Sequence, residues 1–168
     1  MDAIRLAAAV LLIVVFAFAG CATSPETDER RQAAEDDIAA ILSEPLDPGV
    51  YGKTKHCLAD QEYRDFRALD DKRILFEGRG GRLWLNTLRA RCPDLRYAHV
   101  LRIRTVSGSR ICDMDTFYVG DWFDWPWYRR WPWRYNSGWG TGIACSLGQF
   151  QPVTEAQVME IEALIKSR

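Results

Sequence analysis

Few residues of this 168-residue chain fall into the patterns that mark catalytic or metal-binding chemistry. Its two histidines, His56 and His99, lie at no recognised ligand spacing, and no C-x-x-C pair is present. The G-x-S-x-G and H-E-x-x-H motifs are also absent. The glycine-rich stretch 78–81 is followed by Leu83 where a nucleotide-binding loop needs its third glycine, so we predict a hairpin there. The sequence therefore indicates no metal ion, no cofactor and no catalytic residue.

The net charge is close to zero, because 22 lysines and arginines nearly balance 23 aspartates and glutamates. The two signs are nevertheless separated, with thirteen acids and six bases in residues 22–71 and ten bases and two acids in residues 72–110. We expect many of these bases to pair with the acids that precede them. The alternative is a basic strand surface, which includes Arg102 and Arg104 and binds an anion such as a lipid headgroup.

A long hydrophobic run is missing as well, since the apolar stretch 6–19 is shorter than the ~18 residues that a membrane-spanning helix needs. The stretch follows Arg5 and precedes small residues, which is the pattern of a secretory signal. Its end, Phe18-Ala19-Gly20-Cys21, resembles the bacterial lipobox, at which the signal is cut and the cysteine is lipidated. The alternative is a plain secretory signal that is cut after Ala19 and releases the protein into the periplasm.

The number of cysteines, five, supports lipidation of Cys21. An odd number in an exported protein leaves one thiol without a partner, and lipidation would account for it. In the lipoproteins that this chain resembles, an aspartate after the cysteine favours the inner membrane, so Ala22 predicts the periplasmic face of the outer membrane. We expect the remaining cysteines to form two disulfides, in any of three connectivities. These candidates are Cys57, Cys92, Cys112 and Cys145.

These signals divide the chain into a signal peptide (1–20), a lipidated tether with one helix (21–49) and a single domain (50–168). The helix should have Pro25 in its first turn and end before Pro45. Its apolar stripe is thin, which indicates a spacer or a helix laid loosely on the domain in preference to a partner-binding helix.

The domain begins with short segments of alternating apolar and polar residues, separated by turns. It ends with a helix, for which Thr154 and Gln157 are placed as a capping box. We therefore predict an α+β fold with a small antiparallel sheet or partly closed barrel, an N-terminal helix, a C-terminal helix and stabilising disulfides.

A tryptophan-rich segment, 121–140, contains the repeated motif Trp-Pro-Trp, and its prolines oppose a helix or a central strand. One interpretation is a loop folded over the protein's own sheet. The other is a binding surface for a sugar, a bilayer interface or a partner protein, because tryptophan combines a large apolar face with a polar edge. The candidate binding residues are Trp122, Trp125, Trp127, Trp131, Trp133, Arg129 and Arg130.

Several motifs between Cys57 and the C-terminus are similar to a known family. They are Cys57-Leu58, the segment 68–71, Cys92, the segment 109–112, Cys145 and the segment 150–154. Through them the chain resembles a family of short, uncharacterised proteobacterial envelope proteins, a domain of unknown function with four cysteines. Because no activity is known for that family, the resemblance implies a compartment and a fold unit and no catalytic residue. The tryptophan-rich segment departs from the family pattern.

Together these observations predict a non-catalytic, periplasm-facing lipoprotein that acts as an envelope accessory or binding protein. Its expected partners are the membrane, through the lipid anchor, and an envelope protein, a glycan or an anionic lipid. Nucleic acid is not expected in this compartment. One alternative is a small periplasmic hydrolase that uses His56 or the pair Asp113 and Asp115. Another is an inhibitor of an envelope-directed hydrolase, which rests on size, anchoring and disulfides alone.

The lipobox interpretation makes a direct prediction for Cys21. Mass spectrometry of the N-terminal peptide should find acyl chains on this residue in the wild type and none in Cys21→Ser. Each buried methylene of an acyl chain contributes about 0.8 kcal/mol to membrane attachment, so any Cys21→Ser protein that loses its signal should leave the membrane fraction. Cleaved Cys21→Ser protein that stays with the membrane would contradict lipidation.

Overall fold

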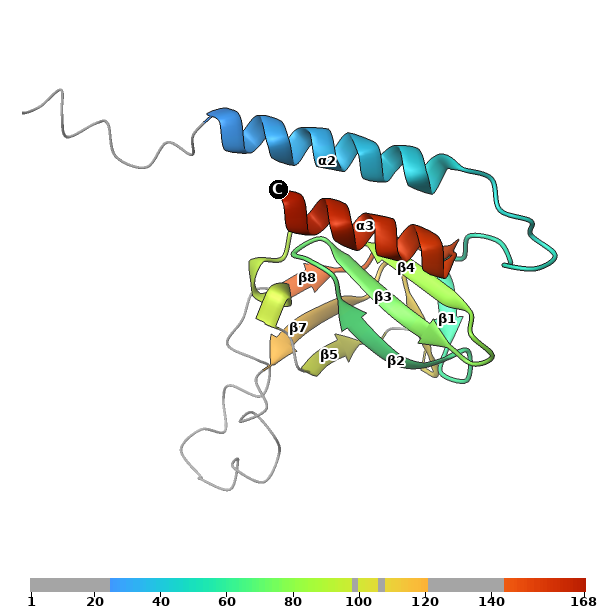
Figure 1. Ribbon diagram of the computed structural model, residues 1–168. Coiled ribbons are helices and arrows are strands. Elements are labelled where there is room, and N and C mark those ends of the chain that lie inside the picture. Colours follow the sequence, from blue (N-terminus) through green and yellow to red (C-terminus); the bar gives the residue numbers. More distant parts are fainter. Residues whose placement is uncertain (1–24, 98–99, 106–107, 121–143) are drawn as a thin grey trace, which may run out of the picture.

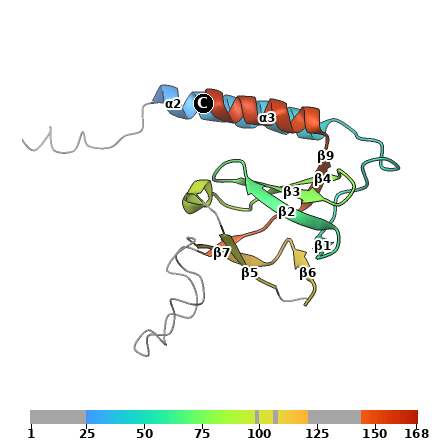
Figure 2. The ribbon, with the colours of Figure 1, turned by 60° about the horizontal axis from the view of Figure 1, so that its bottom comes forward.

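The computed structural model describes residues 25–97, 100–105, 108–120 and 144–168. Within them, two helices and three antiparallel sheets form three layers (Figure 1). Figure 2 shows the helices α2 (Pro25–Ser43) and α3 (Glu155–Ser167) on one side, the largest sheet in the middle and the smaller sheets on the other side. The predicted α+β class, with a helix near each end of the domain, is confirmed.

The largest sheet has four strands in the order β2-β3-β4-β9, and a second sheet has three in the order β5-β7-β8. The four strands are β2 (Tyr63–Ala68), β3 (Arg73–Gly78), β4 (Leu83–Thr87) and β9 (Phe150–Val153). The three are β5 (Val100–Arg104), β7 (Thr116–Gly120) and β8 (Ala144–Ser146). A two-stranded sheet joins β1 (Cys57–Ala59) to β6 (Arg110–Cys112), and the short 3₁₀ helix η1 (Pro93–Tyr97) follows β4.

The predicted glycine hairpin connects β3 and β4. Gly80 and Gly81 adopt φ angles of 76° and 79°, a region that residues with a Cβ atom rarely occupy. The hairpin sets the register in which Phe76 lies opposite Trp84. This register determines which side chains of the two strands share a face.

Both faces of the central sheet are covered, which explains why β3 is buried almost throughout. Phe76 and Trp84 face the smaller sheets, where they belong to the larger core cluster together with Phe117 and Phe150. Leu75 points the opposite way and packs in a second core below the helices. The members of that second core are Ile38, Leu75, Leu85, Val153, Val158 and Ile161.

Helix α2 begins at Pro25, as predicted, and packs on α3. Ile38 of α2 is fully buried, although the apolar stripe of the helix is thin. At the C-terminal end of the helix, Gln157 donates a hydrogen bond to the Ile41 carbonyl (3.1 Å), and Gln151 donates one to the Leu42 carbonyl. Backbone carbonyls that would otherwise need water are thereby satisfied by the domain.

Two disulfides form among the four expected cysteines, Cys57–Cys112 and Cys92–Cys145. The first links directly opposed residues of β1 and β6, and the second links the segment before η1 to β8. Each closes a loop of more than 50 residues. In the chain-entropy description, a loop of this length stabilises the folded state by about 4 kcal/mol.

A buried cluster of ion pairs fixes α2 on the sheet. Its centre is Glu35, which pairs with Arg73 of β3, with Arg91 (3.0 Å) and with Arg168 (2.8 Å). Asp70, in the turn after β2, pairs with the same Arg73 (2.8 Å) and with Arg168. Acids from the first part of the chain therefore pair with bases from the middle part, as the charge separation predicted.

The cluster keeps Glu35 ionised. Burial alone would raise the pKa of this carboxyl, but the hydrogen bond from Arg73 and the charges of Arg73, Lys72 and Arg91 outweigh it and lower the pKa from 4.5 to about 2. Only 13% of the Glu35 side chain is exposed, so solvent screens these interactions weakly.

Removing this charge should destabilise the protein and change its response to acid. Glu35→Gln should lower the free energy of unfolding at pH 7 by about 3 kcal/mol, because Arg73 remains buried with one partner fewer. Since the folded pKa lies below the unfolded one, the stabilisation is complete above pH 4.5 and is lost as the pH falls towards 2.

Denaturant unfolding of the two proteins across this pH range measures the difference. Asp37→Asn, on the exposed side of the same helix, is the matched control for the change in charge and should have little effect. A difference between wild type and Glu35→Gln that stays constant down to pH 2 would show that Glu35 is not held ionised by the cluster.

Candidate functional site

A groove of about 710 Å³ lies between the N-terminal half of α3 and the β3–β4 hairpin. Val153 and Val158 line it from β9 and α3, and Leu83 lines it from β4. The loop after α2 adds Val50 and Tyr51 to the lining. The groove is therefore the part of the helix–sheet interface at the hairpin end, where the second core meets solvent.

Exposed apolar side chains gather at this groove. Among the described residues, four large hydrophobic side chains are exposed: Val50, Tyr51, Met114 and Met159. All except Met114 line the groove. Single exposed hydrophobic residues are normal on a protein surface, but several around one concave site indicate a binding surface.

The rim of the groove carries charges of both signs in equal number. Arg67 pairs with Glu77 (3.8 Å) and with Glu162, and Arg64 lies 3.9 Å from Glu77. Arg82 and Glu155 complete the set of rim charges. Because the arginines of β2 already have carboxylate partners, the rim favours a ligand with little net charge and an apolar part that enters the groove.

No pattern in the sequence predicts this groove. Val50 and Tyr51 follow a Pro-Gly turn and belong to no periodic pattern. The only available signal was Met159, a large apolar residue of α3 next to the buried stripe of Val158 and Ile161 instead of within it.

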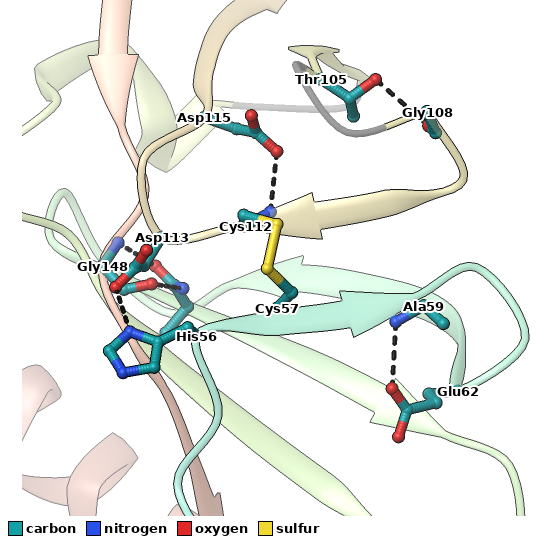
Figure 3. Close-up of a disulfide and its surroundings, with 11 residues drawn as sticks. His56, Cys57, Ala59, Glu62, Thr105, Gly108, Cys112, Asp113, Asp115 and Gly148 are labelled. Atoms are coloured by element: carbon teal, nitrogen blue, oxygen red, sulfur yellow. Dashed lines mark hydrogen bonds and ion pairs between the residues drawn. A yellow bond between two sulfur atoms is a disulfide. The ribbon is translucent and has the colours of Figure 1, made fainter.

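A second site combines residues that the hydrolase hypothesis named separately. Pairing of β1 with β6 brings His56 and Asp113 together beside the Cys57–Cys112 disulfide (Figure 3). His56 Nδ1 lies 2.8 Å from Asp113 Oδ2, and the Asp113 backbone N–H donates to the His56 carbonyl (2.8 Å). The histidine side chain is 73% exposed, whereas the aspartate is nearly buried. An aspartate in this position holds the imidazole in one orientation and leaves Nε2 towards solvent.

The pair Asp113 and Asp115 does not form the expected two-carboxylate face of a strand. Both residues lie in the turn between β6 and β7. Asp115 is buried and accepts a hydrogen bond from the Cys112 backbone N–H (2.7 Å), which closes the turn (Figure 3). This is the ordinary role of aspartate in a turn, and it uses one carboxylate for structure.

A polar pocket of about 400 Å³ adjoins Asp113. Arg89 reaches across it and donates from Nε to the Asp113 carbonyl (3.3 Å). Thr54, Thr87 and Gln149 supply hydroxyl and amide groups to the lining. A small polar ligand fits a pocket with this lining, which includes Asp113 and not His56.

The remaining predicted site residues are placed only in part. Cys21 lies outside the described residues, as do Trp122, Trp125, Trp127, Trp131, Trp133, Arg129 and Arg130. Arg102 belongs to β5, and Arg104 is exposed at the end of that strand.

The described part of the chain contains neither a cluster of metal-ligating side chains nor a helix suited to cross a membrane. No three His, Cys, Asp or Glu side chains there are grouped so as to hold a metal ion. No helix in the same ranges is long and apolar enough to cross a membrane.

The α+β fold, the two disulfides and the surface groove define a small disulfide-bonded domain, and its sequence contains no recognisable catalytic motif. The chain belongs to a family of unknown function, DUF6491, which matches residues 4–122. The match covers β1 to β7 and ends before Cys145 and α3. No curated protein and no solved structure matches the chain. Membership of a family of unknown function is confirmed. The match does not extend to Cys145 or the segment 150–154, so it does not test the part of the resemblance that rested on them.

Proposed function

We propose that this protein is a non-catalytic lipoprotein, anchored through Cys21 to the periplasmic face of the outer membrane, that binds an envelope protein in the groove beside α3. The observation that carries the binding function is the gathering of Val50, Tyr51 and Met159 at one groove. Three apolar side chains around one concave surface indicate a partner that covers them.

The cysteines support the proposed compartment. Two disulfides account for four of the five cysteines and leave Cys21 as the one without a disulfide partner. Disulfides form and persist in oxidising compartments such as the periplasm. Lipidation of the remaining cysteine fits this arithmetic, as does its position after the apolar stretch 6–19.

The shape of the groove favours a protein segment over a glycan or an anionic lipid. Leu83, Val153 and Val158 offer an apolar floor, and sugars prefer flat aromatic faces and many hydrogen-bond partners. An anionic lipid favours a surface with an excess of cations, whereas the rim of the groove carries equal numbers of both signs. A segment with an apolar anchor and balanced charge satisfies both parts of the groove.

Helix α2 places the groove away from the anchor. The helix begins four residues after Cys21, and its 19 residues span about 28 Å. Val50 and Tyr51 lie in the loop that follows its far end. With Cys21 in the membrane, the groove would therefore be offered to proteins in the periplasm.

Crosslinking in intact cells tests the groove. A photoreactive residue at position 155, on the groove rim, should form one main adduct with a protein of the envelope. Met159→Glu should reduce the yield of this adduct about tenfold, because a charge in the contact removes an apolar anchor. Both Met159 and the control position Met114 are exposed (61% and 70%), so neither change should alter the melting temperature.

The control separates the groove from general effects of added charge. Met114→Glu places the same charge outside the groove and should leave the adduct unchanged. An adduct that survives Met159→Glu, or that disappears equally with Met114→Glu, would show that the groove is not the binding surface.

The contact between His56 and Asp113 favours a second candidate function, a small hydrolase. In such an enzyme Nε2 of His56 would remove a proton from the attacking water, and Asp113 would hold the imidazole in place. A general base of this kind contributes about 10²- to 10⁴-fold to the rate.

The two candidates differ in what mutation of His56 and Asp113 should do. If the protein only binds, His56→Ala and Asp113→Asn should leave both the adduct at position 155 and the cellular phenotype unchanged. Loss of the cellular phenotype in both variants, with the adduct intact, would instead favour the hydrolase, because loss of a general base lowers the rate at least about a hundredfold. Both variants need a thermal melt as a check, because Asp113 is nearly buried.

A further inference from the structure

A cavity of about 340 Å³ lies at the opposite end of the helix pair from the groove. Thr27 and Arg31 line it from the first turns of α2, Arg96 from η1, and Ile165 and Arg168 from the end of α3. Figure 1 shows these three places at the same end of the molecule, where the blue start of α2 lies beside the C-terminal end of α3.

This cavity is the basic end of the buried ion-pair cluster. The connected ion pairs, with the adjoining pair Arg31–Asp28, contain two more cations than carboxylates. The cations are Arg31, Lys72, Arg73, Arg91, Arg96 and Arg168, and the carboxylates are Asp28, Glu35, Asp70 and Asp71. The lining of the cavity itself carries three arginines, Arg31, Arg96 and Arg168, against one carboxylate, that of Asp70. An excess of positive charge beside a cavity attracts an anion.

The arginines of the cavity differ in how far they are exposed and in how closely they contact carboxylates. Arg168 is 7% exposed and is held by Glu35 and Asp70, so it forms a fixed base. Arg31 and Arg96 are much more exposed, and their contacts with carboxylates, 3.8 and 3.4 Å, are long. Guanidinium groups of this kind can turn to bind a phosphate with two parallel hydrogen bonds.

The position of the cavity indicates the source of the anion. Helix α2, which carries Thr27 and Arg31, begins four residues after Cys21, and four extended residues span at most about 14 Å. If Cys21 is lipidated, as the proposed function requires, the cavity lies at the level of the lipid headgroups. We propose that this cavity binds the phosphate group of an anionic phospholipid next to the anchor.

A negatively charged membrane repels the acidic residues at the start of α2, but most of them are paired with arginines. Glu26 is paired with Arg30, and Asp28 is paired with Arg31. Of the acids in the first five residues of the helix, only Glu29 has no ion pair. Asp94 of η1 is a further carboxylate at this end for which the described residues form no ion pair, so the excess of positive charge is confined to the lining of the cavity.

Binding of a headgroup here would orient the domain. The anchor alone restrains one point and leaves the domain free to rotate about it. A second contact at the same end fixes α2 relative to the membrane and holds the groove at the far end of the helix, about 28 Å away. The proposed protein-binding site would then face the periplasm.

Native mass spectrometry of the full, lipidated protein tests the assignment, because the acyl chains on Cys21 and any retained phospholipid appear in the same spectrum. The protein is released from micelles that contain phosphatidylglycerol or phosphatidylcholine. Wild type should retain one phosphatidylglycerol and little phosphatidylcholine. Arg31→Gln combined with Arg96→Gln should bind phosphatidylglycerol about 25-fold more weakly, since each basic residue near an anionic surface contributes about fivefold.

Arg64→Gln combined with Arg82→Gln is the matched control, because it removes two charges at the groove end and should leave retention unchanged. All four positions are exposed or partly exposed, so the variants should fold.

Equal retention by wild type and the Arg31/Arg96 variant would overturn the proposal. Inorganic phosphate that binds through Arg31 and Arg96, without preference for phosphatidylglycerol over phosphatidylcholine, would overturn the lipid assignment. Absence of acyl chains on Cys21 would contradict the lipid anchor that the proposed function assumes. The preference for phosphatidylglycerol over phosphatidylcholine would still show whether the cavity binds an anionic headgroup.

Discussion

The ion pairs of Glu35 hold together segments that are distant in the sequence. Its carboxylate lies against Arg73 of the central sheet, Arg91 after β4 and Arg168 at the end of α3. A buried ion cluster of this kind adds little net stability compared with apolar packing of the same volume. What it adds is a defined position, because buried charges find their partners only in one arrangement of the helix on the sheet.

The rest of the structure depends on that position. With Ile38 buried under α2, the two helices form one layer over the second core. The same placement creates the cationic cavity at the start of α2 and carries the loop with Val50 and Tyr51 to the groove at its end. The sequence indicated a spacer or a helix laid loosely on the domain, whereas α2 is packed on α3 and joins the end with the cavity to the end with the groove.

Local sequence signals predicted much of the fold. Short segments of alternating apolar and polar residues indicated strands, the glycines before Arg82 indicated the hairpin, and the capping box at Thr154 is formed as expected. These features depend on near neighbours and on the period of each element. The cysteine count also predicted two disulfides, but the choice among three connectivities depended on the pairing of strands far apart in the chain.

The Glu35 ion pairs and the contact between His56 and Asp113 could not be predicted from the sequence for the same reason. Glu35 is followed directly by Asp36 and Asp37, and nothing local distinguishes the buried carboxylate from its exposed neighbours. His56 and Asp113 are 57 residues apart and meet only through the pairing of β1 with β6.

Hydrogen–deuterium exchange at neutral pH tests most directly whether α2 is a fixed part of the domain. Amides in the second half of α2, around Ile38, should exchange as slowly as those of β3, because both open only with the whole domain. Rapid exchange throughout α2 while β3 stays protected would show instead that the helix moves independently of the sheet.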